Sequence, residues 1–459
     1  MKFYMVSLGC AKNLVDSETI INILEKNGHE LVFEENQADI VLIMTCAFIK
    51  MARDEAESVI NEFTAKKEKY GFKVYVGGCY AKRYSSEVEN RFPDVDGWFG
   101  ISNLSKITEL LTEKENRLKE SFEIPNEYEK YTGRKLTTPS HWAYLKISDG
   151  CTHKCAYCAI PNIRGKYRSR TIDDIITEAK YLTDTGVKEF QVIAQDTGLY
   201  GIDLNKKHML VPLLEKLEEI SGLEWIRLLY INPFSMPNDL IDFMSSSKKI
   251  VKYLDIPMQH ASEHVLKLMK RPGNGDEYLK LISDIRNKIP EIAIRSTFIT
   301  GFPGETDEDF ETLLKFLEEA KINRAGFFKY SDEEGTAAFD YPDKIDEKIK
   351  EERYQRIAKI QRRISSELTN KRKGKTVKII IDNKFESLSM RHISDQFRDR
   401  KIRLVNSYIG RTEQDAPEVD AIVLAYGIPS NLNLKTGDFI NVKITHTNIY
   451  DSAGKFIDI

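Results

Sequence analysis

Three cysteines within eight residues carry the clearest chemical signal in this sequence. Cys151, Cys155 and Cys158 follow an apolar run, residues 143–147, that predicts a β-strand. Thiolates are the soft ligands that iron–sulfur clusters require, and three of them can bind three irons of a four-iron cluster. The fourth iron is then left without a protein ligand. An open metal position is typical of a catalytic site rather than a structural one.

A zinc knuckle is the structural alternative for these three thiols. Zinc ribbons usually have two-residue gaps and four ligands divided between two knuckles, whereas the gaps here are three residues and two residues. His153 lies inside the three-residue gap and is expected to be a solvated loop residue rather than a fourth ligand. The spacing therefore favours an iron–sulfur cluster.

The other three cysteines are dispersed, and each directly follows a predicted strand. Cys10, Cys46 and Cys79 are separated by 36 and 33 positions. In a doubly wound sheet, ligands bind outside the carboxyl ends of the strands, so these thiols should converge in space. Gly9 and Gly78 would let the backbone come close to a bulky inorganic core. The alternative is three small buried thiols in a hydrophobic core. Three thiols in register at strand ends favour a second cluster with one open iron.

Size and composition are those of an ordinary globular protein. The chain has 459 residues, of which 41% are hydrophobic and 30% charged, enough for two to three domains. A net charge of −3 gives the molecule no overall attraction to nucleic acid. The absence of an 18-residue apolar run or a signal peptide predicts a cytoplasmic protein with no membrane contact. In that reducing compartment, grouped cysteines indicate metal binding or catalysis rather than disulfides.

The elements that must position these cysteines follow from the alternation of strand and helix patterns. Residues 1–115 predict a flavodoxin-like parallel sheet. Its strands are expected at 3–8, 39–44 and 74–76, and its helices at 16–27 and 53–69. Residues 116–140 are charged and polar and are predicted to be a linker. The overall fold class is therefore α/β, with the dispersed cysteines in the first domain.

Residues 141–342 repeat strand and helix patterns and predict a partial TIM-like (β/α)6 barrel, in which chemistry collects at the carboxyl ends of the strands. The six strands are expected at 143–147, 189–195, 225–231, 251–256, 294–300 and 325–330. Gln195 ends the second strand, and a glycine-rich turn, residues 301–306, follows the fifth. His260 follows the fourth strand and either faces the substrate or is a satisfied loop histidine. Arg164 to Arg170 is a basic stretch that is either solvated surface or a contact for an anionic group.

The remainder of the chain predicts a connecting helix and a small β domain. Residues 343–375 contain 12 basic and 6 acidic residues, a net charge of +6. Residues 376–459 contain 11 of each and have strand-like runs at 377–381, 402–405, 421–424 and 439–444. Alternating β-branched residues with glycine turns predict a small antiparallel barrel or sandwich.

The spacing of Cys151, Cys155 and Cys158, with the aromatic Tyr157 before the last thiol, resembles the signature of radical S-adenosylmethionine (SAM) enzymes. The whole chain is similar to the methylthiotransferases, a branch of that superfamily with an N-terminal cluster domain, a radical SAM barrel and a C-terminal TRAM domain. Residues 7–18, 256–262, 296–301 and 410–420 resemble the RimO family in particular. After the first cysteine, the related tRNA enzymes usually have a glutamine–methionine–asparagine run, whereas this chain has Ala11-Lys12-Asn13.

The resemblance implies a transferase that places a methylthio group on the β-carbon of an aspartate in small ribosomal subunit protein twelve; the alternative is a MiaB-like tRNA adenosine methylthiotransferase. It implies two 4Fe-4S clusters, one for the deoxyadenosyl radical and one for sulfur delivery, with SAM as cofactor. The cluster ligands would be the six cysteines, with no catalytic residue beyond them. SAM would be contacted by Tyr157, Gln195, Gly301 and Gly304.

The same resemblance implies partners. The substrate protein would be met free or in the ribosome, and flavodoxin or ferredoxin would donate electrons. A lengthened loop around 390–403 carries five Arg or Lys residues, which suggests a ribosomal RNA contact. Two other classes of protein remain as rivals. An electron-transfer protein would need fully ligated clusters, and a nucleic-acid-binding module with a structural metal would need a strong basic surface.

Overall fold

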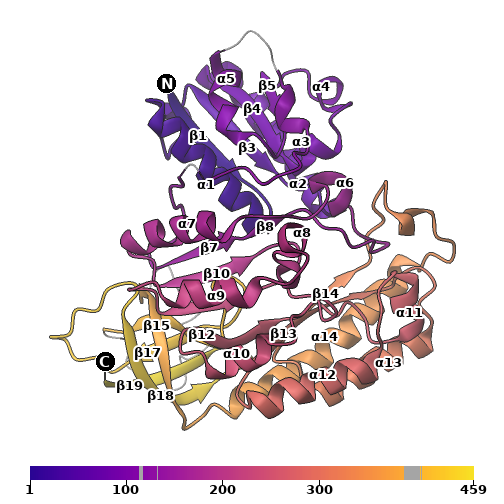
Figure 1. The fold of residues 1–459 in the computed structure, drawn as a ribbon, viewed down its shortest axis with the longest axis vertical. Helices are drawn as coiled ribbons and strands as arrows, with labels where there is room; N and C mark the ends of the chain where they lie inside the picture. The colour runs from indigo at the N-terminus through magenta and orange to yellow at the C-terminus, as the bar shows by residue number, and fades with distance from the viewer. Residues whose placement is uncertain (113–116, 132, 387–403, 405, 459) are drawn as a thin grey trace.

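A computed structural model describes residues 1–112, 117–131, 133–386, 404 and 406–458. Figure 1 shows three parts: an N-terminal sheet domain at the top, a central open barrel beneath it, and a C-terminal β-barrel packed beside the lower part of the central sheet. No helix in these residues is long and apolar enough to cross a membrane. The arrangement leaves the N-terminal domain directly above one end of the central barrel.

The N-terminal domain is a parallel sheet of order β2-β1-β3-β4-β5-β6, which confirms the flavodoxin-like prediction. Its strands are β1 (Lys2–Ser7), β2 (Glu30–Leu31), β3 (Ile40–Thr45), β4 (Lys73–Gly78), β5 (Gly97–Phe99) and β6 (Arg117–Leu118). Its main helices are α1 (Ala11–Lys26), α2 (Lys50–Tyr70) and α5 (Ile107–Thr112), with the short α3 (Cys79–Arg83) and α4 (Val88–Arg91). Alternate residues of β3 pack against α1 and α2, so the strand is buried on both faces.

The predicted linker at 116–140 is wrong at its start, because β6 belongs to the first sheet. Phe99 pairs with Leu118, whose side chain is buried in the same core as Phe99 and Leu110. A strand of two residues is too short to produce a periodic pattern, so composition alone assigned it to the linker.

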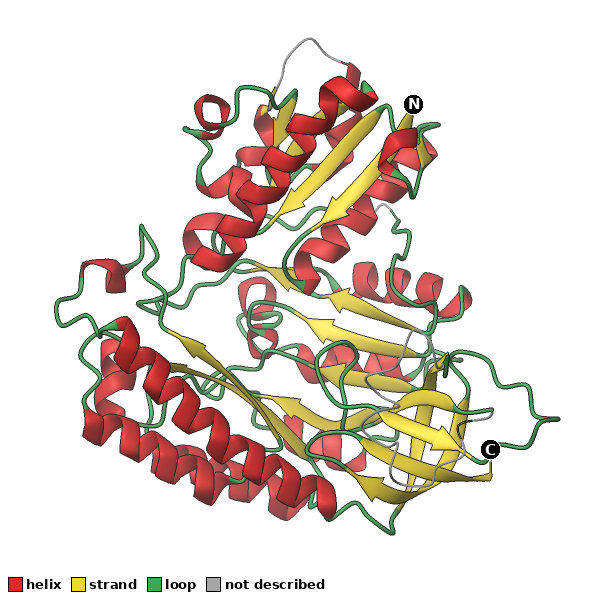
Figure 2. Ribbon diagram, turned by 180° about the vertical axis from the view of Figure 1, so that it is seen from behind, coloured by secondary structure: helices red, strands yellow, loops and turns green. Residues whose placement is uncertain are grey.

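The central domain is a six-stranded parallel sheet of order β14-β13-β12-β11-β10-β7, with helices covering its outer face (Figure 2). The strands are β7 (Trp142–Lys146), β10 (Glu189–Ile193), β11 (Trp225–Leu228), β12 (Ile250–Asp255), β13 (Ala293–Thr300) and β14 (Arg324–Lys329). The longer helices are α7 (Ile172–Asp184), α9 (Leu210–Glu218), α10 (Leu240–Ser246), α12 (Gly275–Lys288), α13 (Asp307–Ala320) and α14 (Glu347–Asn370). Since β7 and β14 are the two edges, the barrel is open, as predicted.

Short elements complete the central domain. The two-residue strands β8 (Ser148–Asp149) and β9 (Arg168–Ser169) pair with each other, and α6 (Ile160–Arg164), α8 (Ile202–Asn205) and α11 (Glu263–Leu268) are short helices in the loops. A capping box of Thr306 and Asp309 starts α13, which ends the glycine-rich turn after β13.

The C-terminal domain is a closed five-stranded barrel, β15-β16-β17-β19-β18. Its strands are β15 (Thr376–Lys384), β16 (Tyr408–Thr412), β17 (Val423–Tyr426), β18 (Phe439–Thr447) and β19 (Ser452–Asp458). One pair departs from the predicted antiparallel arrangement. β18 pairs with β15 rather than β17, so β19 returns beside β17 in the same direction. The predicted loop at 390–403, and the predicted strand at 402–405 apart from Leu404, lie outside the described residues.

A segment of the C-terminal domain, residues 413–420, covers part of the central sheet on the face turned away from its helices. Arg227 donates to the Glu413 carbonyl at 2.6 Å, and the Tyr253 hydroxyl donates to Asp420 at 2.6 Å. The Tyr144 hydroxyl donates to Glu418 at 3.0 Å. The lower part of the concave face is therefore covered by the C-terminal domain, and residues of α1 from the N-terminal domain pack against its upper part.

Asp415 is the most constrained charge in this segment. It is fully buried and is contacted by Arg324 at 2.7 Å and Arg372 at 3.0 Å. Replacing Asp415 with Ala leaves two arginines without their carboxylate, so we expect the free energy of unfolding to fall by about 3 kcal/mol or more. Urea denaturation measures the change. Asp458→Ala, which removes only an exposed hydrogen bond from Asn441, is the control and should alter stability little. Equal effects of the two substitutions would contradict this account.

Candidate functional site

The three dispersed cysteines stand at the carboxyl ends of three adjacent strands. Cys10 lies between β1 and α1, Cys46 directly follows β3, and Cys79 is the first residue of α3 after β4. A Cβ atom placed on Gly9 would stand 2.5 Å from the Cβ of Cys46, so glycine is what allows this close approach. The Cys79 thiol donates to Asn13 Oδ1 at 3.6 Å, and Asn13 follows Cys10 by three residues. The three segments therefore meet at one edge of the sheet.

Burial sets the ionisation of these thiols. Desolvation raises the pKa of Cys46, and it raises the pKa of Cys79 to about 12 despite the nearby Arg164 guanidinium. Cys10 is exposed. A thiol that holds its proton at neutral pH becomes a thiolate when a metal displaces the proton, so this set of donors fits a metal centre.

The clustered cysteines lie in the loop between β8 and α6, above the first barrel strand. The loop is fixed by backbone hydrogen bonds, from Cys151 N to Gly165 O at 3.0 Å and from Ala156 N to Met269 O at 2.9 Å. Burial raises the pKa of Cys151 to about 11 and that of Cys158 to about 12.

Arg271 is the nearest cation to this second group. Its guanidinium donates to the Cys155 Sγ at 3.7 Å and to the Pro257 carbonyl at 2.9 Å. A guanidinium beside a thiolate lowers the electrostatic cost of gathering several negative sulfurs at one place. No spacing pattern in the sequence pointed to Arg271, because it lies more than a hundred positions from the cysteines.

All six cysteines are free, so each is available as a metal ligand. Among the residues that the structure describes, no group of three or more His, Cys, Asp and Glu side chains is placed to hold one metal ion. In a four-iron cluster each thiolate binds a different iron. The assignment of the six cysteines to two iron–sulfur clusters stays a prediction.

The three arginines of the basic stretch Arg164 to Arg170 are not solvated surface, so that interpretation is wrong for them, and the contact with an anionic group stays a prediction. The guanidiniums of Arg164, Arg168 and Arg170 are buried, and only Lys166 in this stretch is an exposed basic residue. Each buried arginine is held by internal acceptors. Arginine side chains are ordinarily exposed to solvent, but here they are covered at the junction with the N-terminal domain.

Arg164 connects the two cysteine groups. It is 1% exposed and is the last residue of α6, six positions after Cys158 in the chain. Its guanidinium donates to Asp149 at 2.8 Å in the barrel and to Asn13 at 2.7 Å in the N-terminal domain, and it lies 3.6 Å from the Cys79 sulfur. It also pairs with Asp16 at 3.1 Å. The Arg164 side chain thus holds the Cys79 segment of the N-terminal domain next to the barrel loop that carries the clustered cysteines.

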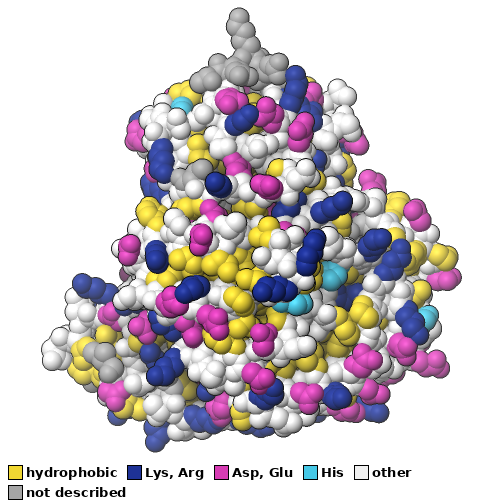
Figure 3. All heavy atoms as spheres, viewed as in Figure 1, with side chains coloured by type: hydrophobic (Ala, Val, Ile, Leu, Met, Phe, Trp, Pro, Cys, Tyr) yellow, Lys and Arg dark blue, Asp and Glu magenta, His cyan; other side chains and the backbone are white. Residues whose placement is uncertain are grey.

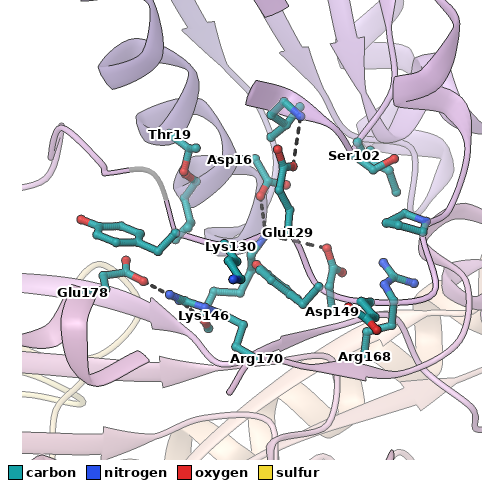
Figure 4. A pocket seen from close by; sticks show the side chains of 17 residues that line it. Asp16, Thr19, Ser102, Glu129, Lys130, Lys146, Asp149, Arg168, Arg170 and Glu178 are labelled. Carbon is teal, nitrogen blue, oxygen red and sulfur yellow. Dashed lines mark hydrogen bonds and ion pairs between the residues drawn. The ribbon is translucent and has the colours of Figure 1, made fainter. Parts of the chain in front are cut away.

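Further buried ion pairs surround this contact (Figure 4). Lys146 pairs with Asp16, and Arg170 pairs with Glu178 and with Asp174. Except for Asp174, these residues line a cavity of about 70 Å³ at the domain junction, which is not lined by any cysteine. A cavity of that size holds at most a few water molecules, since each occupies about 30 Å³ in the liquid. It is too small for SAM, and we regard it as part of the interface.

Lys12 is a site residue that the sequence reasoning did not single out. Its side chain is 7% exposed, and its ammonium lies 3.4 Å from the centre of the Tyr230 ring at the end of β11. The pKa of Lys12 is lowered to about 8, mainly by burial, with Cys10 and Asp255 opposing the shift and Arg164 adding to it. Its position two residues after Cys10 was the available signal.

The residues predicted to contact SAM lie around the clustered cysteines, and their assignment stays a prediction. Tyr157 packs edge-on against Phe302, which follows Gly301. The side-chain amide of Gln195 donates to Asp149 at 3.0 Å. Gly301 and Gly304 both have positive φ, and a Cβ on Gly301 would stand 2.3 Å from Lys350 Cγ, so helix packing also requires this glycine.

The two histidines considered from the sequence have defined partners. His260 is fully buried; its Nδ1 accepts a hydrogen bond from Ser262 N at 3.0 Å, whereas its Nε2 lies 3.7 Å from Glu305 and has no hydrogen-bond partner among the described residues, so it is only partly satisfied. His153 lies 2.7 Å from Asp196 and is half-buried rather than freely solvated.

Removing Arg164 should loosen the junction. We expect Arg164→Met to leave Asp16 and Asp149 with only Lys146 as a cation, at a cost of about 3 kcal/mol. The rate of limited proteolysis within 119–140 should then rise on the order of 100-fold, because cleavage follows the population of the open form.

The matched control is Arg356→Met, which breaks only an exposed pair with Glu311 on α14 and should leave the proteolysis rate unchanged. An Arg164→Met protein that is as resistant as the wild type would show that the junction does not depend on this side chain.

Comparison with known protein families agrees with the three-part fold. Residues 145–317 match the Radical SAM superfamily, residues 2–100 match "Uncharacterized protein family UPF0004", and residues 374–457 match the TRAM domain. Among solved structures, the radical S-adenosylmethionine methyltransferase TsrM from Kitasatospora setae superposes with a TM-score of 0.53 at 11% identity, covering 72% of this chain and 74% of that one. At that identity the likeness concerns the fold alone.

Similar curated proteins share nearly the full length. The proteins named "Ribosomal protein uS12 methylthiotransferase RimO" from Desulforamulus reducens and Elusimicrobium minutum are each 42% identical over 458 residues, covering 98% and 99% of this chain and 98% and 100% of their own. The protein of that name from Aquifex aeolicus is 42% identical over 455 residues, covering 99% of this chain and 97% of its own.

Proposed function

Because this chain belongs to the RimO family of ribosomal protein uS12 methylthiotransferases, we propose that it transfers a methylthio group to the β-carbon of an aspartate in uS12, small ribosomal subunit protein twelve. One observation carries the proposal. Two groups of three free cysteines lie in segments that Arg164 ties together across the domain junction. A transfer that needs both a radical source and a sulfur source requires two such sites close to each other.

The radical SAM domain takes SAM and an iron–sulfur cluster, and we assign that cluster to Cys151, Cys155 and Cys158. We assign a second 4Fe-4S cluster to Cys10, Cys46 and Cys79. When bound, the first cluster supplies the electron for reductive cleavage of SAM to the deoxyadenosyl radical, and the second supplies the sulfur that a further SAM methylates. Tyr157, Gln195, Gly301 and Gly304 remain our proposed SAM contacts, and we propose no catalytic residue beyond the cluster ligands.

The chain's own residues supply position and shielding. A β-carbon C–H bond has no acidic proton, so a general base cannot activate it and the cofactors must carry the difficult step. The protein must hold the substrate carbon between the two sites and keep water out. The segment at 413–420 closes the lower part of the concave face, and Arg164 fixes the N-terminal domain over its upper end. Substrate is therefore expected to enter at the junction.

We propose domain boundaries of 1–115 for the N-terminal cluster domain, 141–342 for the radical SAM barrel and 376–459 for the TRAM-like domain. A linker at 116–140, whose first residues include β6, and a connecting helix at 343–375 join them. The observed α14 lies inside that connecting range. A flavodoxin or ferredoxin would donate electrons, and a ribosomal RNA contact would come from basic residues of the C-terminal part. The substrate protein would be met free or in the ribosome.

The tRNA adenosine methylthiotransferases are the alternative within the same superfamily. Figure 3 shows Lys and Arg side chains interspersed with Asp and Glu side chains over the visible face rather than gathered into one basic surface. The C-terminal domain is neutral, with 11 basic and 11 acidic residues over 376–459. An RNA-binding module is usually basic, so the charge distribution favours a protein substrate.

The choice of substrate is tested by offering uS12 and tRNA side by side to the anaerobically reconstituted enzyme. We expect mass spectrometry to show a methylthio mass increase on one aspartate of uS12 and none on the tRNA. Modification of adenosine in tRNA, with uS12 unchanged, would overturn the proposal in favour of the alternative.

The division of labour between the two cysteine groups is tested by single substitutions. Cys155→Ala should abolish SAM cleavage, measured as 5′-deoxyadenosine by liquid chromatography, because it removes a ligand from the barrel site. Cys46→Ala leaves that site intact, so SAM cleavage should persist while methylthiolation of uS12 falls below detection. Full methylthiolation by Cys46→Ala under anaerobic conditions would exclude the two-cluster proposal.

A further inference from the structure

A lysine lies buried beside the N-terminal cysteine group without an anionic partner. Lys12 is in the first turn of α1 and is 7% exposed. Within the described part of the chain, its ammonium has no ion pair or hydrogen bond, and its closest partner is the Tyr230 ring at 3.4 Å. Burying a charge without an opposite charge is costly, and an aromatic face offsets only part of that cost. Lys12 therefore has no anionic group in direct contact within the described residues, and Cys10, Asp255 and Asp149 stabilise its charge only from a distance.

The nearby barrel carboxylate of Asp255 is held at one oxygen, Oδ2, while its Oδ1 has no hydrogen-bond partner among the described residues. Asp255 ends β12, and its carboxylate accepts hydrogen bonds from Arg295 at 3.1 Å and from Tyr230 N at 3.2 Å. Tyr230 is held rigidly as well, with a φ of 61° and with its carbonyl accepting a hydrogen bond from Thr197 N at 2.9 Å. The ring under Lys12 is thus fixed at the carboxyl end of the barrel strands, and among the described residues the ammonium donates no hydrogen bond, so N–H groups turned away from the ring can bind a ligand.

Lys12 also lies between the segments that carry the two cysteine groups. It follows the exposed Cys10 by two residues, and the next residue, Asn13, contacts Arg164 at 2.7 Å. On the barrel side, Thr197 next to Tyr230 adjoins Asp196, which pairs with His153 in the loop of the clustered cysteines. A ligand held by Lys12 would therefore stand at the junction between both sites.

We propose that the Lys12 ammonium binds the side-chain carboxylate of the substrate aspartate. This inference rests on the proposed function, in which that aspartate is modified at its β-carbon. The β-carbon is one bond from the carboxylate carbon, so holding the carboxylate fixes the reacting carbon in position. The same contact selects a substrate residue that has a negative charge. Lys12 is thus a residue that determines substrate specificity and orientation.

The test is a double-mutant cycle between enzyme and substrate. Kd is measured by fluorescence anisotropy for labelled uS12 with its target aspartate intact or changed to asparagine. The binding partners are anaerobically reconstituted wild type, Lys12→Met and Lys12→Arg. We expect the wild type to bind the aspartate form on the order of 10- to 100-fold more tightly, as for hydrogen bonds between charged groups. Lys12→Met should bind both forms alike, and Lys12→Arg should retain part of the preference.

Lys26→Met, at the other end of α1, is the matched control and should keep the wild-type preference. Three results would overturn the inference: a wild type that binds both substrate forms equally, a Lys12→Met that keeps the full preference, or a Lys12→Met that weakens both forms by the same factor. The first of these results is measured on the wild type alone, so the inference can be overturned even if Lys12→Met does not fold.

Methylthiolation by the wild type separates this inference from the proposed function. If the wild type modifies uS12 but the cycle shows no coupling, the proposed function stands and the role of Lys12 does not. If the wild type modifies no aspartate of uS12 in the same preparation, both are overturned. An increase in the KM for SAM in Lys12→Met, with the preference for aspartate intact, would assign Lys12 to SAM instead.

Discussion

The buried contact between Arg164 and the first helix is the constraint on which the rest of this structure depends. Arg164 comes from the barrel, six residues after Cys158, yet its partners Asn13 and Asp16 belong to the N-terminal domain. Buried ion pairs add little net stability, because desolvating the charges costs about as much as their attraction returns. Their effect is on specificity, since any other docking of the two domains would leave buried charges unpaired. The relative position of the two cysteine groups follows from this requirement.

The central sheet uses its two faces differently. One face packs against helices through an apolar core that includes Leu145, Leu228 and Leu254. The opposite face is covered in its lower part by the C-terminal domain, where Arg411 pairs with the buried Glu189 of β10 at 2.8 Å. The upper part remains under the N-terminal domain. The C-terminal barrel therefore also covers part of the concave face of the central sheet. Substitutions in this barrel can alter the site through packing.

Lys12 and Tyr230 show how the two domains build one site that neither contains alone. The lysine belongs to α1 and the tyrosine to the loop after β11, and their contact requires the docking that Arg164 enforces. Residues held in unfavourable backbone conformations cluster where function needs a fixed geometry, and Tyr230, with its positive φ, is one of them. The junction is therefore organised for a ligand as well as for stability.

The sequence by itself determined the fold class, the three-part order and the two sets of cysteines, because strand and helix periodicity and thiol spacing are local signals that survive without tertiary contacts. It placed β6 in a linker, since a two-residue strand has no period, and it left open whether the stretch Arg164 to Arg170 is solvated surface or a contact for an anionic group, since arginines are ordinarily exposed unless they are paired. Only the tertiary structure decided that these arginines are buried, that residues 413–420 cover the sheet, and that Lys12 meets Tyr230. Each of these outcomes depends on residues distant in the chain whose charges can be buried only when both domains are in place.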